Sequence, residues 1–470
     1  MIRLYNTLGR KVEDFKAIRE DSLKLYTCGP TVYDYAHIGN LRAFVFDDTL
    51  RRVLQNGGYQ VNHIMNITDV GHLSSDADEG EDKLEKGAQR DNKTVWEVAQ
   101  QYIDSFEDDM RKLNVLPPNG NNGKYARATD YIDEQIDLVK RLLENGFAYK
   151  TDGAIYFDTT KLDDYGKLTG QKLGDKEVGA RDDVIVDPDK HHPQDFAVWF
   201  FKTGRFANHS MSWDSPWGEG FPGWHLECSA IVHATLGEPV DIHTGGVDHI
   251  GTHHTNEIAQ TEAGYGVKLA DYWLHNEHLL VENTKMSKSK GNFYTLDDIE
   301  KKGFQPLALR LRFLQSHYRS QSSFSWDNLE AAKVSLNNIY AWSDLRFQSQ
   351  KSDKLQPTYA ETFGKFVASM ENDLASPEAL GWLNAMINAA SEIGADSQFI
   401  KEYADKIDTY LGLGLSDRED ISEPQKELIS QREDARNNQD WDKSDSLRQE
   451  LLSQGIEIND TPSGSIWRKV

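Results

Sequence analysis

The segment from residue 23 to residue 70 constrains the fold of this 470-residue chain more than any other segment does. Two short β-rich runs, LKLYT and VNHIMNITDV, flank an amphipathic stretch over residues 40–56 that ends at Gly57-Gly58. A strand, a helix and a second strand in this order predict a βαβ unit, whose two strands are parallel. The chain is therefore predicted to be an α/β protein with a parallel sheet.

Changes of pattern along the chain predict several domains, as its length also does at about 100–200 residues for each domain. A Pro117-Pro118 break, a polar Asp-rich region, a return of apolar runs at DFAVWFF, long helical patterns and a polar stretch follow one another. The predicted segments are 1–114 (first half of the sheet domain), 115–195 (inserted connective subdomain), 196–305 (second half), 306–414 (helical bundle) and 415–470 (small mixed α/β module).

The charge balance limits the kind of partner that this chain can bind. It carries 52 basic and 76 acidic residues, a net charge of −24, which argues against binding nucleic acid through a generally basic surface. An RNA partner would need a local, shaped site. The longest apolar stretch, Phe196 to Phe201, is far too short to span a bilayer, and MIRLYNTLGRKVEDF has no signal-peptide core. We therefore expect a cytoplasmic protein with no membrane partner.

The chain has only two cysteines, Cys28 and Cys228. In a large cytoplasmic protein, metal ligation, catalysis or free thiols are better explanations than a disulfide, and two inert buried thiols are the alternative.

The sequence His37-Ile-Gly-Asn40 lies where the first predicted strand leads into the first predicted helix. A helix N-terminus presents free N–H groups to a phosphate, and Gly39 would let a nucleotide approach closely. The alternative is structural, a histidine that caps the helix and a glycine that makes a turn.

A second candidate phosphate site is the lysine-rich segment ENTKMSKSKGNF, residues 282–293. Lys285, Lys288 and Lys290 could neutralise a polyphosphate there, although such a loop is often only solvated surface. Together, in this order and spacing, HIGN and KMSKS resemble the HIGH and KMSKS signatures of class I aminoacyl-tRNA synthetases. That class implies a Rossmann-like catalytic domain, ATP with Mg²⁺, and attack of an amino-acid carboxylate on the α-phosphate.

A candidate metal site combines three distant segments of the chain. Cys28 and Cys228 supply thiolates, while His253 and Glu257 have the i, i+4 spacing that places both side chains on one helix face. Two thiolates, an imidazole and a carboxylate make a tetrahedral zinc set. Other histidines crowd the same region and could be ligands or none: His225, His243, His249 and His254.

The combination of TCGPTVY before HIGN with GWHLECSA, HHTNE and KMSKS resembles the cysteinyl-tRNA synthetase family, over residues 3 to 468. The resemblance implies one zinc ion per chain, held by Cys28, Cys228, His253 and Glu257, which binds the thiolate of the substrate L-cysteine. Because serine's hydroxyl hardly ionises, it competes poorly for such an ion, and no editing domain is expected.

The same resemblance assigns further residues of the catalytic site. It places His37, Gly39 and Lys288 at the ATP phosphates, with Lys285 and Asn40 assisting catalysis, and it places Thr68, Trp224 and His243 around the substrate cysteine. Asn40 departs from the family's second histidine, so it can donate a hydrogen bond but cannot become cationic. The segments after Asp69 and before His253 also depart from the family pattern.

The C-terminal module resembles the family's anticodon-binding end. Sparse arginine, tryptophan and aspartate residues suit recognition of single-stranded bases by stacking and hydrogen bonding. Position by position, the residues that match anticodon contacts are Arg436, Trp441, Asp445 and Asp460; without the resemblance they would be an ordinary helix surface.

The sequence thus predicts a cysteine-tRNA ligase that uses ATP, L-cysteine and tRNA(Cys), and we expect a monomer. Two alternatives are a ligase that passes cysteine to an amino sugar, and a non-catalytic RNA-binding protein on a synthetase scaffold. The first would lack the C-terminal RNA module, and the second would lose the phosphate motifs.

Overall fold

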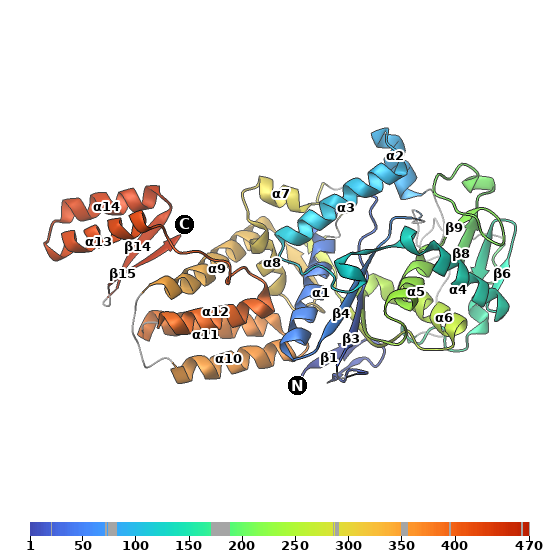
Figure 1. Cartoon of the computed structure of the whole chain (residues 1–470), viewed down its shortest axis with the longest axis horizontal. Coiled ribbons are helices and arrows are strands. Elements are labelled where there is room, and N and C mark those ends of the chain that lie inside the picture. Colours follow the sequence, from blue (N-terminus) through green and yellow to red (C-terminus); the bar gives the residue numbers. More distant parts are fainter. Residues whose placement is uncertain are drawn as a thin grey trace. The chain divides into compact units, whose positions relative to one another are not determined.

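The computed structural model describes residues 1–19, 21–70, 73, 82–170, 189–284, 286, 291–348, 356–393, 396–461 and 464–469. The chain forms two compact units, whose elements are labelled in Figure 1. The first comprises Met1–Asp298 and Tyr318–Ser323, and the second comprises Ile299–His317 and Phe324–Val470. The finer division into five segments stays a prediction.

A five-stranded parallel sheet lies at the centre of the first unit, so the predicted α/β class with a Rossmann-like sheet is confirmed. The strands are β3 (Leu23–Thr27), β4 (Val61–Ile67), β5 (Ala126–Arg127), β10 (Val240–Gly246) and β11 (Ala270–Asn276), in the order β11-β10-β3-β4-β5. Each neighbouring pair is parallel. The winding reverses between β3 and β10, and in such sheets ligands bind beyond the carboxyl ends of the strands at that reversal.

Helices connect the strands of this unit: α1 (Ile38–Asn56), α2 (Lys83–Asp91), α3 (Val95–Lys112), α4 (Ile132–Glu144), α5 (Trp224–Thr235) and α6 (His253–Tyr265). The predicted helix over residues 40–56 is α1, which ends at Gly57-Gly58; Gly58 has a φ of 93°, a conformation that favours glycine. A hairpin of β1 (Arg3–Asn6) and β2 (Lys11–Asp14) is attached to β11 through the Asn6 amide, which donates to the Asp271 carbonyl and accepts from the Trp273 N–H.

The prediction that the parallel sheet resumes at Phe196–Phe201 is wrong. This strand, β8, belongs to an antiparallel sheet in the order β6-β7-β8-β9, with β6 (Ala148–Lys150), β7 (Ala154–Phe157) and β9 (Gly220–Pro222). Both faces of β8 are covered, because Val198 packs into one apolar cluster and Ala197 into another. Its continuous apolar run therefore looks like that of a buried parallel strand.

The segment GWHLECSAIVHATLG lies in the predicted second half of the sheet domain, and its apolar run suggests a further strand, but it forms helix α5. Residues 225–232 are all buried, so the helix has no polar face. A helix that is buried all round shows no 3.6-residue periodicity and cannot be told from a strand by pattern.

The second unit is mainly helical, as predicted, and ends in a small hairpin. Its elements include α8 (Pro306–Leu314), α9 (Trp326–Asp344), α10 (Gln356–Glu371), α11 (Ser376–Ile393), α12 (Ser397–Leu411), α13 (Glu423–Asn437), α14 (Trp441–Ser453), β14 (Ile456–Thr461) and β15 (Gly464–Lys469). The buried Arg310 donates from Nε to the Leu411 carbonyl at 2.7 Å. Gln348 donates to the Trp467 carbonyl and accepts from its N–H, which ties the hairpin to the end of the helical segment.

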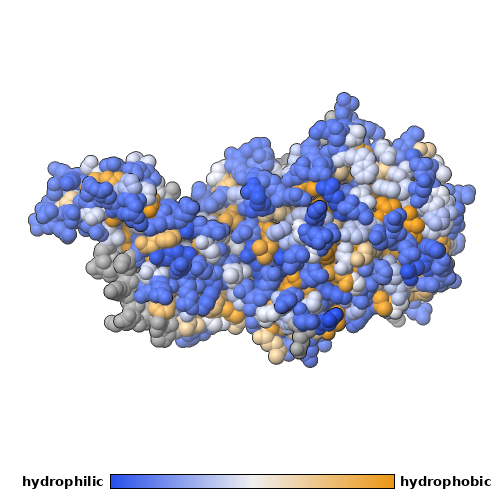
Figure 2. All heavy atoms as spheres, in the orientation of Figure 1, coloured by the Kyte–Doolittle hydropathy of each residue, from blue (hydrophilic) through white to orange (hydrophobic). Residues whose placement is uncertain are grey.

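Short elements near the boundary of the two units are β12 (Leu279–Val281), α7 (Leu296–Lys301) and β13 (Ser322–Phe324). Among the residues described, no helix combines the length and the apolar character needed to cross a bilayer. The face drawn in Figure 2 is mostly hydrophilic, with apolar residues in scattered small areas.

Candidate metal centre and nucleotide pocket

The candidate site lies where the winding of the parallel sheet reverses. Cys28 follows β3 directly, and its N–H donates to the carbonyl of Thr244 in β10 at 3.2 Å. Gly29 comes next, and a Cβ atom built there would lie 1.7 Å from the carbonyl oxygen of Asn66 in β4. Only glycine permits this close approach, so the TCG sequence holds Cys28 at the carboxyl edge of the sheet.

The four predicted zinc ligands lie together. Cys28, Cys228, His253 and Glu257 are buried, and each offers one donor atom within 4.8 Å of the others. His253 and Glu257 lie one turn apart on α6, with Nε2 and Oε1 separated by 2.8 Å, while Cys228 comes from α5, with its Sγ 3.6 Å from His253 Nε2.

A second set of donors overlaps the first. Cys28, His243, His254 and Glu257 also lie within 4.8 Å of one another. His243 Nε2 is 2.7 Å from Glu257 Oε2, and His254 Nε2 is 3.4 Å from Cys28 Sγ. The two sets share Cys28 and Glu257. The first set is completed by Cys228 and His253, and the second by His243 and His254.

The charges of the cluster favour a cation among these side chains. Burial opposes ionisation of Glu257, but His243 and His253 hold its pKa well below the usual value. Burial would lower the pKa of His253, yet Glu257 and Cys228 raise it to about 10. The pKa of Cys228 falls to about 6, because its hydrogen bond with Cys28 and the attraction of His253 outweigh burial and the repulsion by Glu257. The cluster thus holds anionic donor atoms, and the proton on His253 neutralises only part of their negative charge.

The donor atoms also fit a metal ion better than a hydrogen-bond network. Among the described residues, the buried Glu257 Oε1 accepts no hydrogen bond of good geometry, and its one close partner is His253 Nε2, an ion-pair contact at 2.8 Å. An orphaned carboxylate oxygen is costly unless a ligand satisfies it. Nδ1 of His225 lies 3.1 Å from Nδ1 of His253, and this hydrogen bond fixes the orientation of the His253 ring while Nε2 faces Glu257. The sequence had assigned no role to His225.

A pocket of about 270 Å³ lies next to this cluster. His37, Asn40, Trp224, His249 and Phe293 are among the residues that line it. It therefore joins the N-terminus of α1 to the wall of the metal cluster, as a site for an amino acid and a nucleotide would require.

His37 is the N-cap of α1, so the helix-capping role that the sequence offered as an alternative is confirmed. This role leaves the Nε2 atom of His37 available for a ligand. Its Nδ1 accepts hydrogen bonds from the N–H groups of Gly39 and Asn40 at 3.1 and 3.2 Å, and Asn40 Oδ1 accepts from the His37 N–H. Burial lowers the pKa of His37 to about 4, so its ring is neutral at pH 7. Since Nδ1 accepts, the ring proton is on Nε2.

The lysine-rich segment lies against this turn where it is described. Lys285 and Lys288 themselves lie outside the described residues. A Cβ atom on Gly39 would lie 2.5 Å from Cε of Met286, the Ile38 N–H donates to the Tyr294 carbonyl, and the Phe293 ring contacts His37 edge-on at 5.1 Å. The two segments thus approach each other at Gly39, where the end of the Met286 side chain lies against the backbone.

Of the three residues predicted around the substrate cysteine, Trp224 and His243 contact the cluster, and Thr68 reaches Glu227, the neighbour of Cys228. Trp224 stacks on His253 with ring centroids 4.4 Å apart, and His243 stacks on Trp273 at 4.6 Å. Thr68 follows β4, and its hydroxyl donates to Oε2 of the buried Glu227 at 2.7 Å.

Two buried carboxyl groups near the cluster were missed by sequence reasoning. Within the part of the chain that the structure describes, Oε1 of Glu227 has no hydrogen-bond partner, and burial raises the pKa of this carboxyl well above its usual value. Asp47 in α1 accepts from the Thr244 hydroxyl at 2.6 Å, and burial raises its pKa to about 8. Neither residue belongs to a motif that a single sequence reveals.

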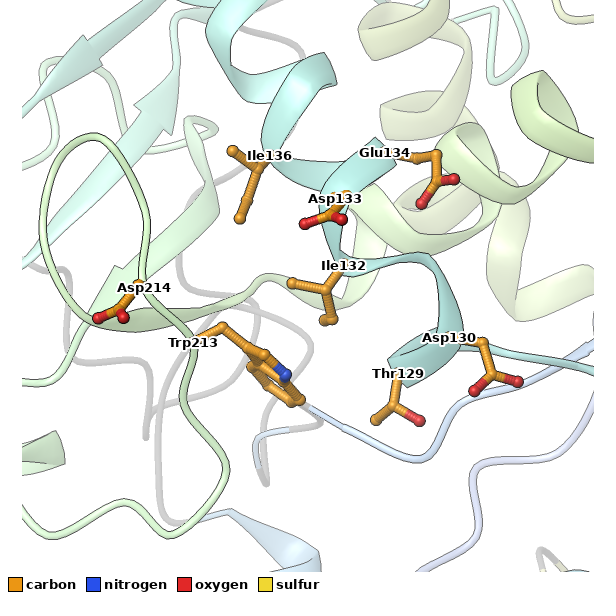
Figure 3. Close-up of a pocket in the computed structure, with 8 residues that line it drawn as sticks. All are labelled: Thr129, Asp130, Ile132, Asp133, Glu134, Ile136, Trp213 and Asp214. Atoms are coloured by element: carbon orange, nitrogen blue, oxygen red, sulfur yellow. The ribbon is translucent and has the colours of Figure 1, made fainter.

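Figure 3 shows a different pocket of about 370 Å³, between the start of α4 and the Trp213-Asp214 loop. Its acidic lining residues are Asp130, Asp133, Glu134 and Asp214. Among the described residues that line it there is no cation, so its field repels phosphate. This pocket does not suit a nucleotide.

The predicted anticodon residues lie in the C-terminal part of the second unit. Trp441 is 56% exposed, with the Arg436 guanidinium 6.0 Å from its ring centroid, and Asp445 is also exposed. Asp460 differs, because its carboxylate binds both Nη1 and Nη2 of the buried Arg432 at 2.8 Å and Arg436 at 2.9 Å. Any contact of Asp460 with RNA would compete with these ion pairs.

Substitution of Asp460 with asparagine is expected to destabilise the hairpin β14–β15 by about 1–3 kcal/mol at pH 7, because it leaves the buried Arg432 without a carboxylate. Arg432 lowers the pKa of Asp460 from 3.8 to about 2. A depressed carboxyl pKa stabilises the fold above about pH 4, and this contribution is lost as the pH falls toward 2. The difference in unfolding midpoint between wild type and variant should therefore become smaller as the pH is lowered. Pulsed hydrogen exchange of β14 and β15 measures this midpoint. Asp442→Asn, an exposed change in the same segment, is the matched control.

Comparison with known proteins places this architecture in a family. Residues 14–334 match the family model described as the catalytic domain of class I (C) tRNA synthetases, and residues 418–468 match the cysteinyl-tRNA ligase anticodon binding domain. The methionyl-tRNA synthetase of Mycobacterium tuberculosis, solved with methionyl-adenylate, has the same fold, with a TM-score of 0.58 and 14% identity, covering 84% of this chain and 89% of that one. A LeuRS from Agrobacterium radiobacter, solved in a ternary complex with tRNA, has a TM-score of 0.60 and 13% identity, covering 86% of this chain and 85% of that one. The chain therefore belongs to the class I aminoacyl-tRNA synthetases.

Curated relatives narrow the class. The cysteine–tRNA ligase of Treponema denticola is 41% identical over 500 aligned positions that cover all of both chains. Cysteine–tRNA ligase 1 of Burkholderia lata is 42% identical, covering 98% of this chain and 96% of its own. Within its class, the chain belongs to the cysteine–tRNA ligase family.

Proposed function

We propose that this chain joins L-cysteine to tRNA(Cys) in two steps. Cysteine and ATP give cysteinyl-adenylate and pyrophosphate, and the terminal adenosine of the tRNA then attacks the activated carbonyl carbon, with AMP leaving. The observation that carries the proposal is the buried set Cys28, Cys228, His253 and Glu257, next to a pocket that reaches the N-terminus of α1.

We assign one zinc ion to Cys28, Cys228, His253 and Glu257. Zinc held by these donors supplies a soft Lewis acid that prefers the substrate's thiolate to a hydroxyl group. The chain's own residues do the rest of the selection: Trp224, stacked on His253, walls the pocket, and His243 orients the Glu257 carboxylate from its second oxygen. The Thr68 hydroxyl, which donates its proton to Glu227, would accept a hydrogen bond from the amino group of the substrate.

The nucleotide is assigned to the α1 end of the pocket. The helix dipole favours phosphate there, and Gly39 leaves room for it. The first N–H groups of α1 are already used by the Tyr294 carbonyl and by His37 Nδ1. The neutral His37 donates its Nε2 proton to a phosphate oxygen, because Nδ1 is occupied by two backbone N–H groups. Lys285 and Lys288 are assigned to the leaving pyrophosphate, and Mg²⁺ to the bound ATP. Asn40 supports His37 through the capping box.

Recognition of the anticodon is assigned to Arg436, Trp441, Asp445 and Asp460. The exposed Trp441 offers a stacking surface, and the Arg436 guanidinium lies 6.0 Å from the centroid of its ring. We further propose that the protein is a cytoplasmic monomer with one active site. In this chain, the segments 1–114 and 196–305 are the two halves of the catalytic domain, and 415–470 is the anticodon-binding module.

Cysteine-dependent ATP–pyrophosphate exchange tests this function. We expect exchange with cysteine to exceed exchange with serine by about 10³-fold or more, because sulfur affinity at a metal discriminates better than shape alone. Prolonged dialysis against a chelator should remove one zinc per chain, measured by mass spectrometry of the metal, and should abolish exchange until zinc is restored. Exchange that persists in zinc-free protein would contradict the assignment.

The acceptor of the activated cysteine needs a separate assay. Charging of tRNA(Cys) with no transfer to an amino sugar is the expected outcome, since residues 418–468 match an anticodon binding domain. Exchange without charging would favour the amino-sugar ligase, and absence of both would favour the non-catalytic RNA-binding protein.

A further inference from the structure

A series of hydrogen-bonding side chains connects the N-terminal hairpin to the candidate metal centre. The Thr7 hydroxyl oxygen lies 2.7 Å from Nδ1 of His275, and Nε2 of His275 lies 2.8 Å from Nδ1 of His254. Nε2 of His254 lies 3.4 Å from Sγ of Cys28, one of the proposed zinc ligands. We name Thr7, His275 and His254 the Thr7 network.

The three residues of the Thr7 network come from three elements of the first unit. Thr7 directly follows β1 at the turn of the hairpin, His275 lies in β11, and His254 lies in α6. The Thr7 N–H donates to the Trp273 carbonyl at 2.8 Å, which fixes this turn against β11. Thr7, His275 and His254 are 9%, 4% and 0% exposed, so bulk water has little access to replace a lost partner.

The metal end of the network sets the direction of its hydrogen bonds. A cysteine that binds zinc is a thiolate, which can only accept, so Nε2 of His254 carries the proton of that ring. Burial and neighbouring histidines lower the pKa of both rings, so both are neutral. Nδ1 of His254 is then an acceptor, and Nε2 of His275 donates to it. Nδ1 of His275 becomes an acceptor in turn, and the Thr7 hydroxyl is the donor that it needs.

The metal-facing nitrogen of His254 has one further neighbour. Nδ1 of His249, a ring that lines the nucleotide pocket, lies 3.3 Å from Nε2 of His254. The proton on Nε2 is therefore shared between two acceptors, Cys28 and His249. The bond from His275 strengthens this shared donor, because hydrogen bonds in a series polarise one another. A donor at the Thr7 end thus affects the charge on the sulfur atom at the other end.

We propose that Thr7 is a positioning residue of the metal centre, which acts through His275 and His254 on the thiolate of Cys28. The hydrogen bond from His254 withdraws negative charge from the sulfur atom and so tunes how strongly Cys28 donates to the metal. The match to the family's catalytic domain begins at residue 14, so Thr7 lies before the matched segment. The proposal rests on the proposed function, because it needs zinc on Cys28.

Metal affinity and a cobalt spectrum test the proposal in the absence of cysteine and ATP. Thr7→Val removes the hydroxyl group and keeps the branched shape, whereas Thr7→Ser keeps the hydroxyl group. We expect Thr7→Val to bind zinc about tenfold more weakly than wild type, and Thr7→Ser to bind it within about twofold, in competition with a chromophoric chelator. With Co²⁺ in place of zinc, the sulfur-to-cobalt charge-transfer band should move to lower energy in Thr7→Val alone, because a weaker hydrogen bond holds the sulfur electrons less tightly.

A matched variant separates this effect from a loosened hairpin. Asn6→Ala removes the side chain that ties the hairpin to β11 and leaves every member of the Thr7 network in place. It should lower the thermal midpoint at least as much as Thr7→Val does, while its zinc affinity and cobalt band stay as in wild type. Equal shifts of affinity and band in Asn6→Ala and Thr7→Val would show that the hairpin acts only as support, and would overturn the proposal.

Exchange kinetics connect the network to the proposed function. In zinc-loaded protein, Thr7→Val should raise the KM for cysteine about tenfold and leave the KM for ATP within about twofold, because only cysteine binds at the metal. Unchanged zinc affinity and an unchanged band in Thr7→Val would overturn this proposal alone. Wild type that binds zinc but shows no cysteine-dependent exchange would overturn the proposed function, while the affinity and band would still decide the role of Thr7. Wild type that binds no zinc would overturn both.

Discussion

Replacement of Cys228 with serine is expected to remove the bound zinc and to lower cysteine-dependent ATP–pyrophosphate exchange by about 10³-fold or more, while the fold persists. A serine hydroxyl stays protonated near neutral pH and is a poor ligand for zinc, whereas the pKa of Cys228 is already lowered to about 6. The side chain is fully enclosed in α5, and serine has nearly the same volume, so the cost to stability should be about 1–2 kcal/mol. Metal content per chain, exchange rate and circular dichroism measure the three effects.

A pair of histidine variants decides which of the two overlapping donor sets holds the ion. His253→Ala should lose zinc and exchange activity together, because His253 belongs only to the proposed set. His254→Ala should keep one zinc per chain, because His254 belongs only to the alternative set with His243. The two residues are neighbours on α6 and equally buried, so each variant is a control for the other. Zinc retained in His253→Ala and lost in His254→Ala would transfer the site to the alternative set.

The parts of the site that were predictable from sequence are those fixed by local geometry. The i, i+4 spacing of His253 and Glu257 needs only a helix, and His37 and Asn40 form their capping box within four residues. The parts that were missed depend on contacts between distant segments. Glu227 meets Thr68 across 159 residues, and Asp47 meets Thr244 across 197. No periodicity or motif in one sequence encodes such pairs.

The fold was predictable to the same extent and for the same reason. The βαβ pattern of residues 23–70 was recognisable although residues 44–54 of α1 are all buried, because polar residues such as Asp47, Arg51 and Arg52 interrupt its apolar run and the helix stops at two glycines. The errors at Phe196–Phe201 and at α5 fall on segments that are buried on every side. Such segments lose the polar positions that reveal a period, so an antiparallel strand and a helix both looked like strands of the central sheet.

The exchange reaction should also depend strongly on His37, for a reason that can be separated from helix capping. His37→Ala removes the Nδ1 acceptor that caps α1, at a cost of about 1 kcal/mol, and removes the Nε2 donor from the phosphate site. Loss of one preorganised donor to a developing charge typically slows a reaction about 10²–10³-fold. We expect that fall in the kcat of exchange, with a smaller change in the KM for ATP.

His37→Asn separates the two roles. Asparagine is a favoured N-cap residue whose side-chain oxygen replaces Nδ1 as the acceptor, but its short side chain offers no donor at the position of Nε2. The thermal midpoint of this variant should therefore match wild type while its exchange rate stays as low as that of His37→Ala. Because burial holds the pKa of His37 near 4, the wild-type rate should show no titration of this residue between pH 6 and 8. Wild-type exchange in His37→Asn would mean that His37 only caps the helix, and the phosphate would then have to be held by the helix dipole and other groups without the imidazole.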